Sequence, residues 1–332
     1  MRVHLRGEGV AAACSAALLA RASLSPTIER ISRRPAPVVM LSDQALALVR
    51  DVLGAPDLWA AMPRVDRRVV AWGAADPVAL PHAATIVSGE ALNAALDDFL
   101  LPGPAAAPAD FTIHASPPFP FGQIRRFGHR DATAIPVRLI ADDDRSACWI
   151  ESVADGWLFL IPGGGEEGWL LGVGATIDAL LSDSHLVAPR IDPLDAPGTI
   201  FSTSPGLLTP LHTDDALACG GGALSFDPIC GDGTSQAARE AILAAAVVAG
   251  IAEGGDAVAL VAHYEAMLTA AMRRHLAMCM GFYQAGGDAP WWQQQRADLA
   301  DGHAWCTDIL ARTPEPRFLL QGDRLIARGV AA

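Results

Sequence analysis

Two glycine-containing segments carry the residues whose types and spacing fit phosphate binding. The first is Gly7-x-Gly9-x-x-Ala12, between an apolar stretch and an alanine-rich one. In a dinucleotide-binding turn, the first glycine permits a tight turn, the second lets the backbone approach a pyrophosphate, and the third small residue lets helix and strand pack closely. The N–H groups at the helix start favour the phosphates. The segment therefore predicts a dinucleotide cradle, with a plain tight turn as the alternative.

An acidic residue stands where such a cradle needs one. Glu29 stands in the stretch TIER, about 20 residues after the glycines, where a carboxylate accepts hydrogen bonds from the ribose hydroxyls. Arg33 or Arg34 is within reach of a phosphate, although arginines after a strand are more often solvated. The elements that must position these residues are a strand over 2–6, a helix over 10–22 and a second strand. This is the β-α-β unit of a parallel crossover.

The second segment is LACGGGALSFDPICGDGTSQAAREAILAA, over 217–245. It reads as a strand, a turn of small residues and a helix. Asp227-Pro228 precedes Gly231-x-Gly233, which opens the helix. Amides at such a helix start can face an anionic or electron-rich group. An ordinary strand–loop–helix connection with glycines for turning is the alternative.

The composition excludes several kinds of partner. The chain has 332 residues and a formal net charge of −13, and all 24 Lys/Arg positions are arginine. An acidic chain without a basic stripe argues against a nucleic-acid partner. Without lysine, chemistry that requires an ammonium side chain is excluded. The longest apolar runs, near 9–20 and 241–252, are short for a bilayer, so we expect a cytoplasmic protein without a membrane partner.

No residue stands out as a general acid or base. His82 and His212 are the catalytic candidates, although a lone histidine near an apolar strand is more often structural. Trp157 and Phe159 are candidates for a substrate pocket, although both also fit a sheet core. We expect reduced thiols and no metal site, because neither a C-x-x-C pair nor a metal-ligand spacing occurs among Cys14, Cys148, Cys219, Cys230, Cys279 and Cys306.

The remaining sequence indicates a β-rich middle and a helical end. The stretch LPGPAAAPAD, over 101–110, reads as a linker or surface loop. Later segments such as GWLFLIP suit a mostly antiparallel sheet. We therefore expect an α/β fold, α+β overall. It would combine a Rossmann-type domain from 1–110 and 200–260 with an inserted substrate-binding sheet over 111–199 and a helical region over 261–332.

Together these motifs resemble the FAD-dependent monooxygenases of the para-hydroxybenzoate hydroxylase fold, with their flavin-dependent halogenase relatives. That family carries G-D-A-A…D-P…G-x-G-x-x-x-A late in the chain. The resemblance implies that this segment binds the ribityl chain and lies against the flavin ring, while the first glycine segment and Glu29 hold the ADP part. DGWLFLIPGGGEEGWLLGVG looks like the family's substrate-sheet hairpin. The matching residues of the late motif are Gly220, Ala223, Asp227, Pro228, Gly231, Gly233 and Ala237.

Three departures from the family accompany the resemblance. Gly221 stands where members usually have an aspartate that bonds the ribityl hydroxyls. The family's middle D-G motif is not recognisable in FTIHASPPFPFGQIRRFG. Halogenases use an essential lysine to deliver hypohalous acid, and this chain has none. The last departure argues against halogenation.

The resemblance implies an FAD-dependent monooxygenase that hydroxylates an electron-rich aromatic substrate through a flavin hydroperoxide. NAD(P)H or a separate flavin reductase would supply electrons. The substrate would be a small aromatic molecule or a partner protein's side chain, since some relatives act on partner proteins during quinone-cofactor maturation. One alternative is a degenerate flavoprotein fold, with weak or no FAD binding, that serves as a binding or scaffold protein. A nicotinamide-only oxidoreductase is the other, and it leaves the second glycine segment unused.

Overall fold

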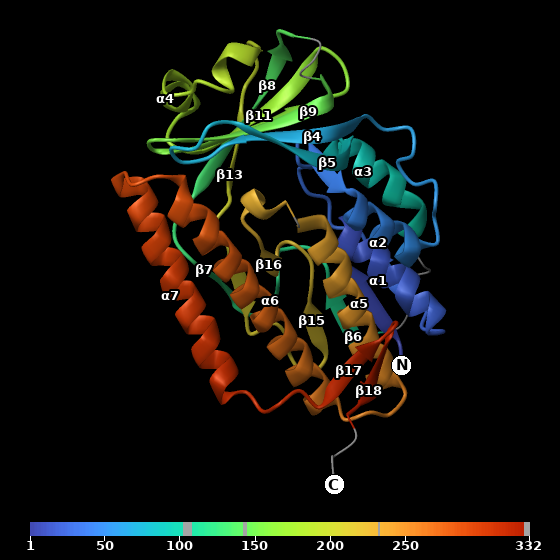
Figure 1. Ribbon diagram of the computed structural model, residues 1–332. Helices are drawn as coiled ribbons and strands as arrows, with labels where there is room; N and C mark the ends of the chain where they lie inside the picture. Colours follow the sequence, from blue (N-terminus) through green and yellow to red (C-terminus); the bar gives the residue numbers. More distant parts are fainter. Residues whose placement is uncertain (102–107, 142–144, 232, 329–332) are drawn as a thin grey trace.

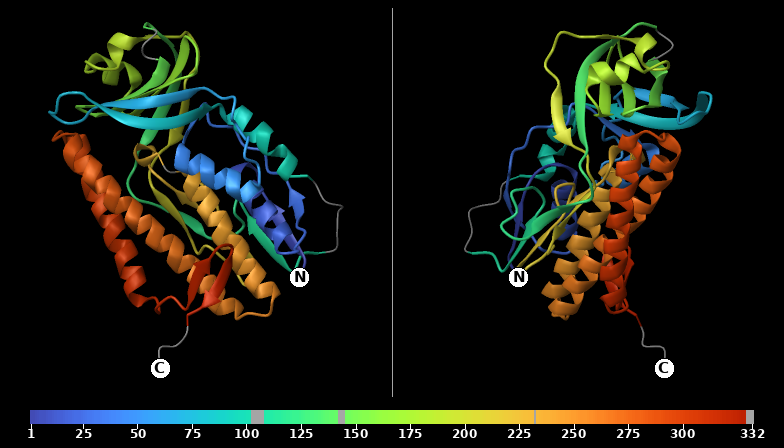
Figure 2. Two further views of the ribbon diagram at one scale, coloured as in Figure 1. Left: turned by 45° about the vertical axis from the view of Figure 1, so that its right-hand side comes forward. Right: turned by 90° about the vertical axis from the view of Figure 1, so that its left-hand side faces the viewer.

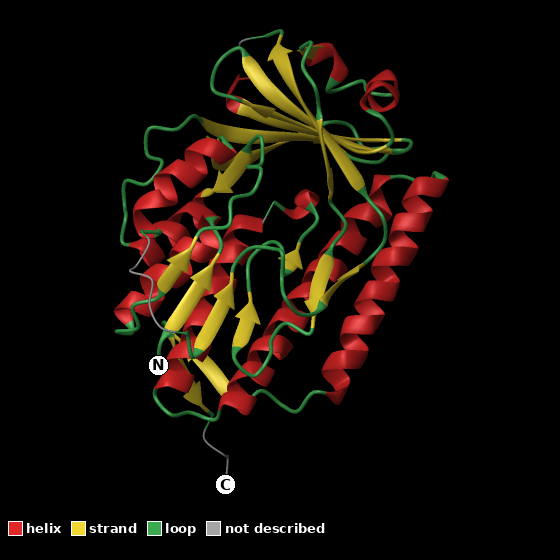
Figure 3. Cartoon of the chain, turned by 180° about the vertical axis from the view of Figure 1, so that it is seen from behind, coloured by secondary structure: helices red, strands yellow, loops and turns green. Residues whose placement is uncertain are grey.

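The computed structural model describes residues 1–101, 108–141, 145–231 and 233–328 and builds them around two main sheets (Figure 1). The smaller one is parallel, in the order β15-β6-β1-β2. From behind, its arrows point the same way (Figure 3). Helix α1 (Gly9–Arg21) joins its first two strands, which confirms the predicted β-α-β unit. The strands are β1 (Val3–Arg6), β2 (Thr27–Glu29), β6 (Phe111–His114) and β15 (Ala216–Ala218).

A nine-stranded sheet lies across the top of Figure 1. Its order is β12-β8-β11-β10-β9-β4-β5-β3, with β13 also pairing to β8. The pairs are antiparallel except β4 with β9, so the sheet is mostly antiparallel, as predicted. The strands are β3 (Val39–Ser42), β4 (Arg64–Ala71), β5 (Val78–Val87), β8 (Asp131–Leu139), β9 (Ala147–Val153), β10 (Gly156–Pro162), β11 (Glu167–Gly174), β12 (Ile191–Pro193) and β13 (Thr199–Ser202).

Strand pairing cuts across the expected boundary at 110. Strands β3 to β5, inside the expected 1–110 range, belong to the nine-stranded sheet. Strand β6, inside the expected 111–199 range, pairs with β1 in the parallel sheet. The sequence of a short apolar strand such as FTIH does not show which strand it pairs with, so its pattern alone could not assign it to one of the two sheets. Most of the expected linker, residues 102–107, lies outside the described residues.

Helix α5 (Gly233–Ala252) lies in the middle of the molecule and packs against α1, α2 and α6. The helix is longer than the apolar run at 241–252, which by itself is short for a bilayer. By length and composition it is the one helix of the described chain that could cross a bilayer, but 61% of its apolar window is buried inside the protein. That burial is typical of a core helix. The other helices are α2 (Asp43–Leu53), α3 (Gly89–Leu96), α4 (Ile177–Ser182), α6 (Ala257–Gly286) and α7 (Pro290–Arg312).

The C-terminal part contains more than the expected helices. Helix α7 runs back alongside α6, and the described chain ends in a hairpin that lies near α5 (Figure 2). A third small sheet, in the order β16-β14-β7, lies beside α6. The strands of these two small sheets are β7 (Gln123–Arg126), β14 (Gly206–Thr209), β16 (Leu224–Ser225), β17 (Phe318–Gln321) and β18 (Arg324–Ala327).

The turn between β1 and α1 leaves no room for a side chain at Gly7. Its φ is +146°, and a Cβ there would lie 2.9 Å from the backbone of both Ala115 and Ser116, directly after β6. Backbone atoms cannot retreat as the end of a flexible side chain can. Gly9 has a φ of +80°, but its Cβ would meet only Asn93 Oδ1, at 3.9 Å.

Gly7→Ala is therefore expected to lower the free energy of unfolding by about 3 kcal/mol, because backbone strain and overpacking add. Gly9→Ala is the matched control, with about 1–2 kcal/mol from its left-handed backbone alone. Urea unfolding followed by tryptophan fluorescence compares the two variants. Equal losses would contradict the close approach of this turn to β6.

Candidate functional site

A cavity of about 350 Å³ lies between the nine-stranded sheet and the start of α5. Apolar side chains form most of its lining, and Asp227 and Thr234 are its polar residues. Apolar cavities with a few polar groups are typical of small-molecule and cofactor sites. The sheet side of the cavity is formed mainly by Met40, Phe159, Ile161, Trp169, Leu171 and Phe201.

The second glycine segment forms the opposite wall. Asp227, Pro228, Gly231 and Gly233 all line the cavity. The short 3-10 helix η4 (Pro228–Cys230) ends at Gly231, whose φ of +63° favours glycine. Beyond its chain neighbours, a Cβ at Gly231 or Gly233 would meet no atom of the described residues within 4 Å, so a ligand can approach the backbone closely there. Asp232, between the two glycines, lies outside the described residues.

Position along β10, and not the face of the strand, separates the predicted pocket residue that lines the cavity from the one that does not. Trp157, Phe159 and Ile161 share a face of the strand because side chains alternate with a period of two. Phe159 and Ile161 face the cavity. Trp157 is fully buried farther along, where Tyr283 of α6 covers it, and its Nε1 donates to the Tyr283 hydroxyl over 3.3 Å.

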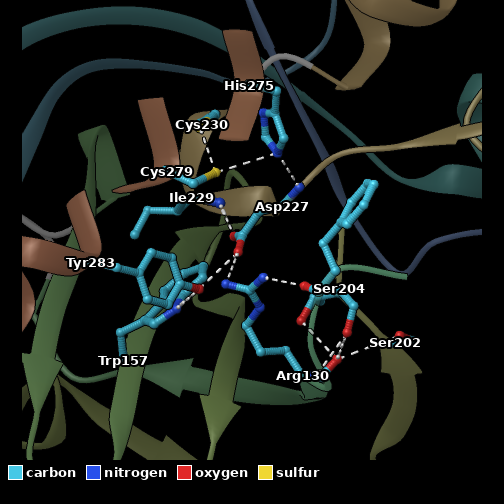
Figure 4. Close-up of polar contacts among 12 residues, drawn as sticks. Arg130, Trp157, Ser202, Ser204, Asp227, Ile229, Cys230, His275, Cys279 and Tyr283 are labelled. Carbon is cyan, nitrogen blue, oxygen red and sulfur yellow. Dashed lines mark hydrogen bonds and ion pairs between the residues drawn. The ribbon is translucent and has the colours of Figure 1, made fainter. Parts of the chain in front are cut away.

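A buried ion pair supports the glycine wall from behind (Figure 4). Arg130 Nη1 lies 3.3 Å from Asp227 Oδ2, and neither side chain is exposed. The Tyr283 hydroxyl donates to the same carboxylate oxygen over 2.8 Å, and the Ile229 N–H donates to Oδ1 over 3.0 Å. The Arg130 guanidinium also stacks over the Tyr283 ring, 4.8 Å from its centre. These residues join β8, η4 and α6 at one point.

Neighbouring groups stabilise the ionised form of the Asp227 carboxylate. Burial raises the pKa of its carboxyl, while Arg130, the Ile229 N–H and the Tyr283 hydroxyl oppose that rise. Each of these groups stabilises the ionised carboxylate. Arg130 is held in turn, because its Nη2 donates to Phe127 O over 3.1 Å and its N–H donates to Ser204 Oγ over 2.7 Å. Asp227 therefore acts as an anchor of the wall.

The two glycine segments lie in close contact. A Cβ at Gly220, whose φ is +83°, would lie 2.9 Å from the Cβ of Ala11 in α1. The Gly220 N–H donates to Glu240 Oε2 of α5 over 2.8 Å. Next to this contact, a Cβ at Gly221 would meet no atom within 4 Å. Small residues thus bring the second glycine segment into close contact with α1.

Glu29 ends β2 beside the turn at Gly7, whose N–H donates to Glu29 O over 2.9 Å. The Arg6 side chain donates to the Glu29 carboxylate over 2.7 Å, and His4 lies 3.2 Å from it. Hydrogen bonds from Arg6 and then His4 lower the pKa of Glu29 to about 2. Its side chain remains 47% exposed, so the ionised carboxylate can still accept hydrogen bonds from a ligand.

The arginines after β2 have partners within the chain. The Arg33 N–H donates to Glu8 Oε1 over 2.6 Å, just before α1. Arg34 Nη2 donates to Thr199 Oγ1 over 3.0 Å. Arg34 also lines a neighbouring cavity of about 340 Å³, which shares Ala36, Pro37 and Trp169 with the first one. Arg34 thus stands at the edge of the site.

The two catalytic candidates lie away from the cavity. His82 is on β5, where burial lowers its pKa, and its Nε2 has no hydrogen-bond partner among the described residues. His212 pairs with Glu265 at 3.6 Å, and that interaction raises its pKa. Neither histidine is in the described lining of the cavity. Sequence spacing alone could not show this, because residues far apart in the chain build the cavity.

Comparison with known proteins bears on the fold. No family model matches the sequence, and no curated protein matches it. The structure of QhpG, a peptidyl tryptophan dihydroxylase essential for tryptophylquinone cofactor biogenesis, matches with a TM-score of 0.78 and 18% identity, over 98% of this chain and 86% of its own. The chain has the fold of the flavin-dependent hydroxylases and halogenases.

Two further structures support this statement. CmlS, a flavin-dependent halogenase, matches with a TM-score of 0.77 and 16% identity, over 94% of this chain and 71% of its own. A salicylate hydroxylase substrate complex matches with a TM-score of 0.64 and 14% identity, over 95% and 98%. The predicted resemblance and fold class are confirmed.

Within this flavin-dependent hydroxylase fold, two of the three departures in the sequence have structural counterparts. Gly221 leaves open space where a side chain would stand. In the region of the missing D-G motif, the backbone after β6 packs against Gly7, and Pro117 packs against Gly222. Ser116 Oγ accepts a hydrogen bond from the Glu8 N–H over 3.2 Å. Close backbone packing thus occupies this region instead of an acidic side chain.

Asp227→Asn is expected to lower the free energy of unfolding by about 3–5 kcal/mol, because it leaves the Arg130 charge buried without its counter-ion. Tyr283→Phe, the control, removes the hydrogen bond to the same carboxylate and also the acceptor of the Trp157 Nε1–H, and should cost roughly 1.5–3 kcal/mol. Urea unfolding without added ligand measures both. A loss for Asp227→Asn no larger than that for Tyr283→Phe would argue against the ion pair as the anchor.

We expect the free energy of unfolding to depend on pH through Glu240, because burial raises the pKa of this carboxyl to about 8. The folded protein then binds more protons than the unfolded chain between the ordinary glutamate value and pH 8. The contribution of Glu240 to stability is therefore present at low pH and is lost as pH rises, by up to about 1.4 kcal/mol per pH unit. Glu240→Gln should remove this slope.

The test compares urea unfolding of wild type and Glu240→Gln between pH 5 and about pH 8, the upper end of the Glu240 window. Glu253→Gln, an exposed carboxylate just after the same helix, is the matched control and should keep the wild-type slope. If Glu240→Gln kept that slope as well, the carboxyl would titrate normally in the folded protein.

Proposed function

We propose that this protein is an FAD-dependent monooxygenase that hydroxylates an uncharged, electron-rich aromatic group. The observation that carries the proposal is the open glycine backbone at Gly231 and Gly233, in the wall of the apolar cavity under the nine-stranded sheet. The fold shared with flavin-dependent enzymes supports it.

The residues present fit FAD. The start of α1, with Gly7, Gly9 and Ala12, would hold the pyrophosphate, and Glu29 would accept from the ribose hydroxyls. Gly220 brings the second segment against α1, and the open positions at Gly231 and Gly233 would let the flavin ring approach the backbone. The bound and reduced cofactor would activate dioxygen for transfer of one oxygen atom to the substrate.

The described lining of the cavity favours a neutral substrate. Its titratable side chain is Asp227, which already binds Arg130 and Tyr283. An aromatic carboxylate would bring a second negative charge into an apolar cavity without a cation to pair with it. Phe159, Trp169 and Phe201 instead offer ring faces and edges to an uncharged aromatic group. They would orient it and exclude water.

A side chain of a partner protein is our preferred substrate. QhpG, with the same fold, is described as acting on peptidyl tryptophan. At the edge of this cavity, Phe201 is 37% exposed and its neighbour Ile200 is 73% exposed. Apolar surface thus continues from the cavity to the outside along β13, where a partner chain could pack. A small aromatic molecule would enter the same cavity without using this surface.

The compartment and the electron source complete the proposal. All six cysteines are free, which fits a reducing compartment such as the cytoplasm. NAD(P)H or a separate flavin reductase would supply the electrons. The competing functions are a scaffold that has lost FAD and a nicotinamide-only oxidoreductase. The second would leave the open wall at Gly231 and Gly233 without a ligand.

The first experiment titrates the purified protein with FAD and with NAD(P)H and records the visible spectrum. We expect saturable FAD binding with a structured flavin spectrum. Glu29→Ala should weaken FAD affinity roughly 10–100-fold, because hydrogen bonds to the charged carboxylate are lost. Asp192→Ala, an exposed carboxylate paired with Arg138, is the matched control and should bind like wild type. Absence of FAD binding would favour the scaffold.

Activity is then measured with chemically reduced FAD, dioxygen and two sets of aromatic probes. Indoles and phenols, free or in peptides, should gain one oxygen atom by mass spectrometry. Their carboxylated counterparts, with the carboxylate on the ring, should react much more slowly. Equal rates for both sets would contradict a cavity selective for neutral rings.

A further inference from the structure

The sulfur atoms of Cys230 and Cys279 lie 3.6 Å apart (Figure 4). Cys230 is the last residue of η4, between Pro228 and Gly231, which both line the cavity. Cys279 lies on α6, one turn after His275. A disulfide would require the sulfurs to approach by about 1.5 Å. The pair therefore connects the wall of the cavity to α6.

The two thiols differ in access. Cys230 is half-buried, whereas Cys279 is fully buried. Burial raises the pKa of Cys279 well above its ordinary value, and the neighbouring Cys230 and Asp227 raise it further. A dissolved oxidant therefore meets Cys230 first, because Cys230 is the more exposed thiol, and the Cys279 sulfur lies within 3.6 Å of whatever forms on Cys230.

A metal site is the other chemistry open to two cysteines and a histidine, and the geometry disfavours it. His275 Nε2 lies 3.4 Å from Cys279 Sγ, but its lone pair already accepts the Asp227 N–H over 2.8 Å. The ring also stacks flat on Phe226, with 3.9 Å between the ring centres. With Nε2 occupied, the cluster offers two sulfurs, whereas zinc sites use three or four protein ligands.

We propose that Cys230 and Cys279 form a dithiol–disulfide site that hydrogen peroxide oxidises and that controls the η4 wall of the cavity. The Cys230 sulfur attacks a peroxide oxygen, the O–O bond breaks, and water leaves with the thiol proton, giving a sulfenic acid. Cys279 attacks that sulfur, the S–S bond forms, and the hydroxyl leaves as water with the Cys279 proton. Two thiols lose two electrons, and one peroxide becomes two waters.

Closure of the disulfide would draw Cys230 toward α6 and would move the backbone of Pro228 and Gly231 with it. Both residues line the cavity, so its shape would differ between the reduced and oxidised proteins. In one respect this inference rests on the proposed function, because reduced flavin in the cavity would be the local source of peroxide. The chemistry of the two thiols can be tested without flavin by adding peroxide.

The test treats the reduced, flavin-free protein with a small excess of hydrogen peroxide, alkylates the remaining thiols after denaturation, and maps the peptides by mass spectrometry. We expect a Cys230–Cys279 cross-linked peptide that a thiol reductant reverses. Cys230→Ser should abolish it. Cys279→Ser should leave a sulfenic acid on Cys230 that dimedone traps. Cys306→Ser, at a fully buried cysteine of α7, is the control and should cross-link like wild type.

A second readout compares FAD affinity before and after oxidation, which should differ several-fold in wild type and not at all in Cys230→Ser. The inference is overturned if Cys230 and Cys279 stay reduced in the folded protein, if they hold stoichiometric zinc by metal analysis, or if the disulfide forms without changing FAD affinity in a protein that binds FAD. If FAD binds in neither state, the proposed function fails, while the cross-linked peptide still reports the dithiol site.

Discussion

The ion pair between Arg130 and Asp227 is the constraint on which the site depends. Two charges with no exposed surface are stable only together, because either one alone would bear an uncompensated desolvation cost. Arg130 directly precedes β8 of the nine-stranded sheet, and Asp227 opens η4. Tyr283 joins α6 to the ion pair through its hydrogen bond to Asp227, and Trp157 joins β10 through its hydrogen bond to Tyr283. Four elements from distant parts of the chain must therefore meet at one point.

This anchor explains the character of the cavity. The oxygens of the Asp227 carboxylate bind Arg130, Tyr283 and Ile229 within the protein. The carboxylate is therefore not available to a ligand in the cavity as a base. The described cavity lining then offers mainly apolar and aromatic surface together with glycine backbone. Such a site can hold and orient a planar ligand, while the demanding chemistry belongs to a bound cofactor.

The same anchor places the cysteine pair. The Asp227 N–H fixes His275, and Cys230 and Cys279 lie in contact beside them. In the cavity wall, Cys230 thus lies three residues after the anchored Asp227 in the chain. A change at the sulfurs would reach Pro228 and Gly231 without breaking the buried ion pair.

Much of the fold could be predicted from local sequence patterns. Gly7, Gly9 and Ala12 between a strand and a helix predicted the β-α-β unit, because a tight turn and close helix packing require small residues there. The alternating and apolar strands from 147 to 174 predicted an antiparallel sheet. Asp227 and the following glycines predicted a special turn before α5, and the structure places that turn in the wall of the cavity.

Tertiary structure decided what local patterns cannot encode. Strand β6 looks like any short apolar strand, and only its neighbours place it in the parallel sheet. Trp157 and Phe159 share one face of β10. Phe159 lines the cavity, whereas Tyr283 covers Trp157, and only the tertiary structure places Tyr283 there. Nothing in sequence spacing joins Arg130 to Asp227, or Cys230 to Cys279. Such contacts between distant residues depend on packing in three dimensions, whereas turns and strands follow from neighbours along the chain.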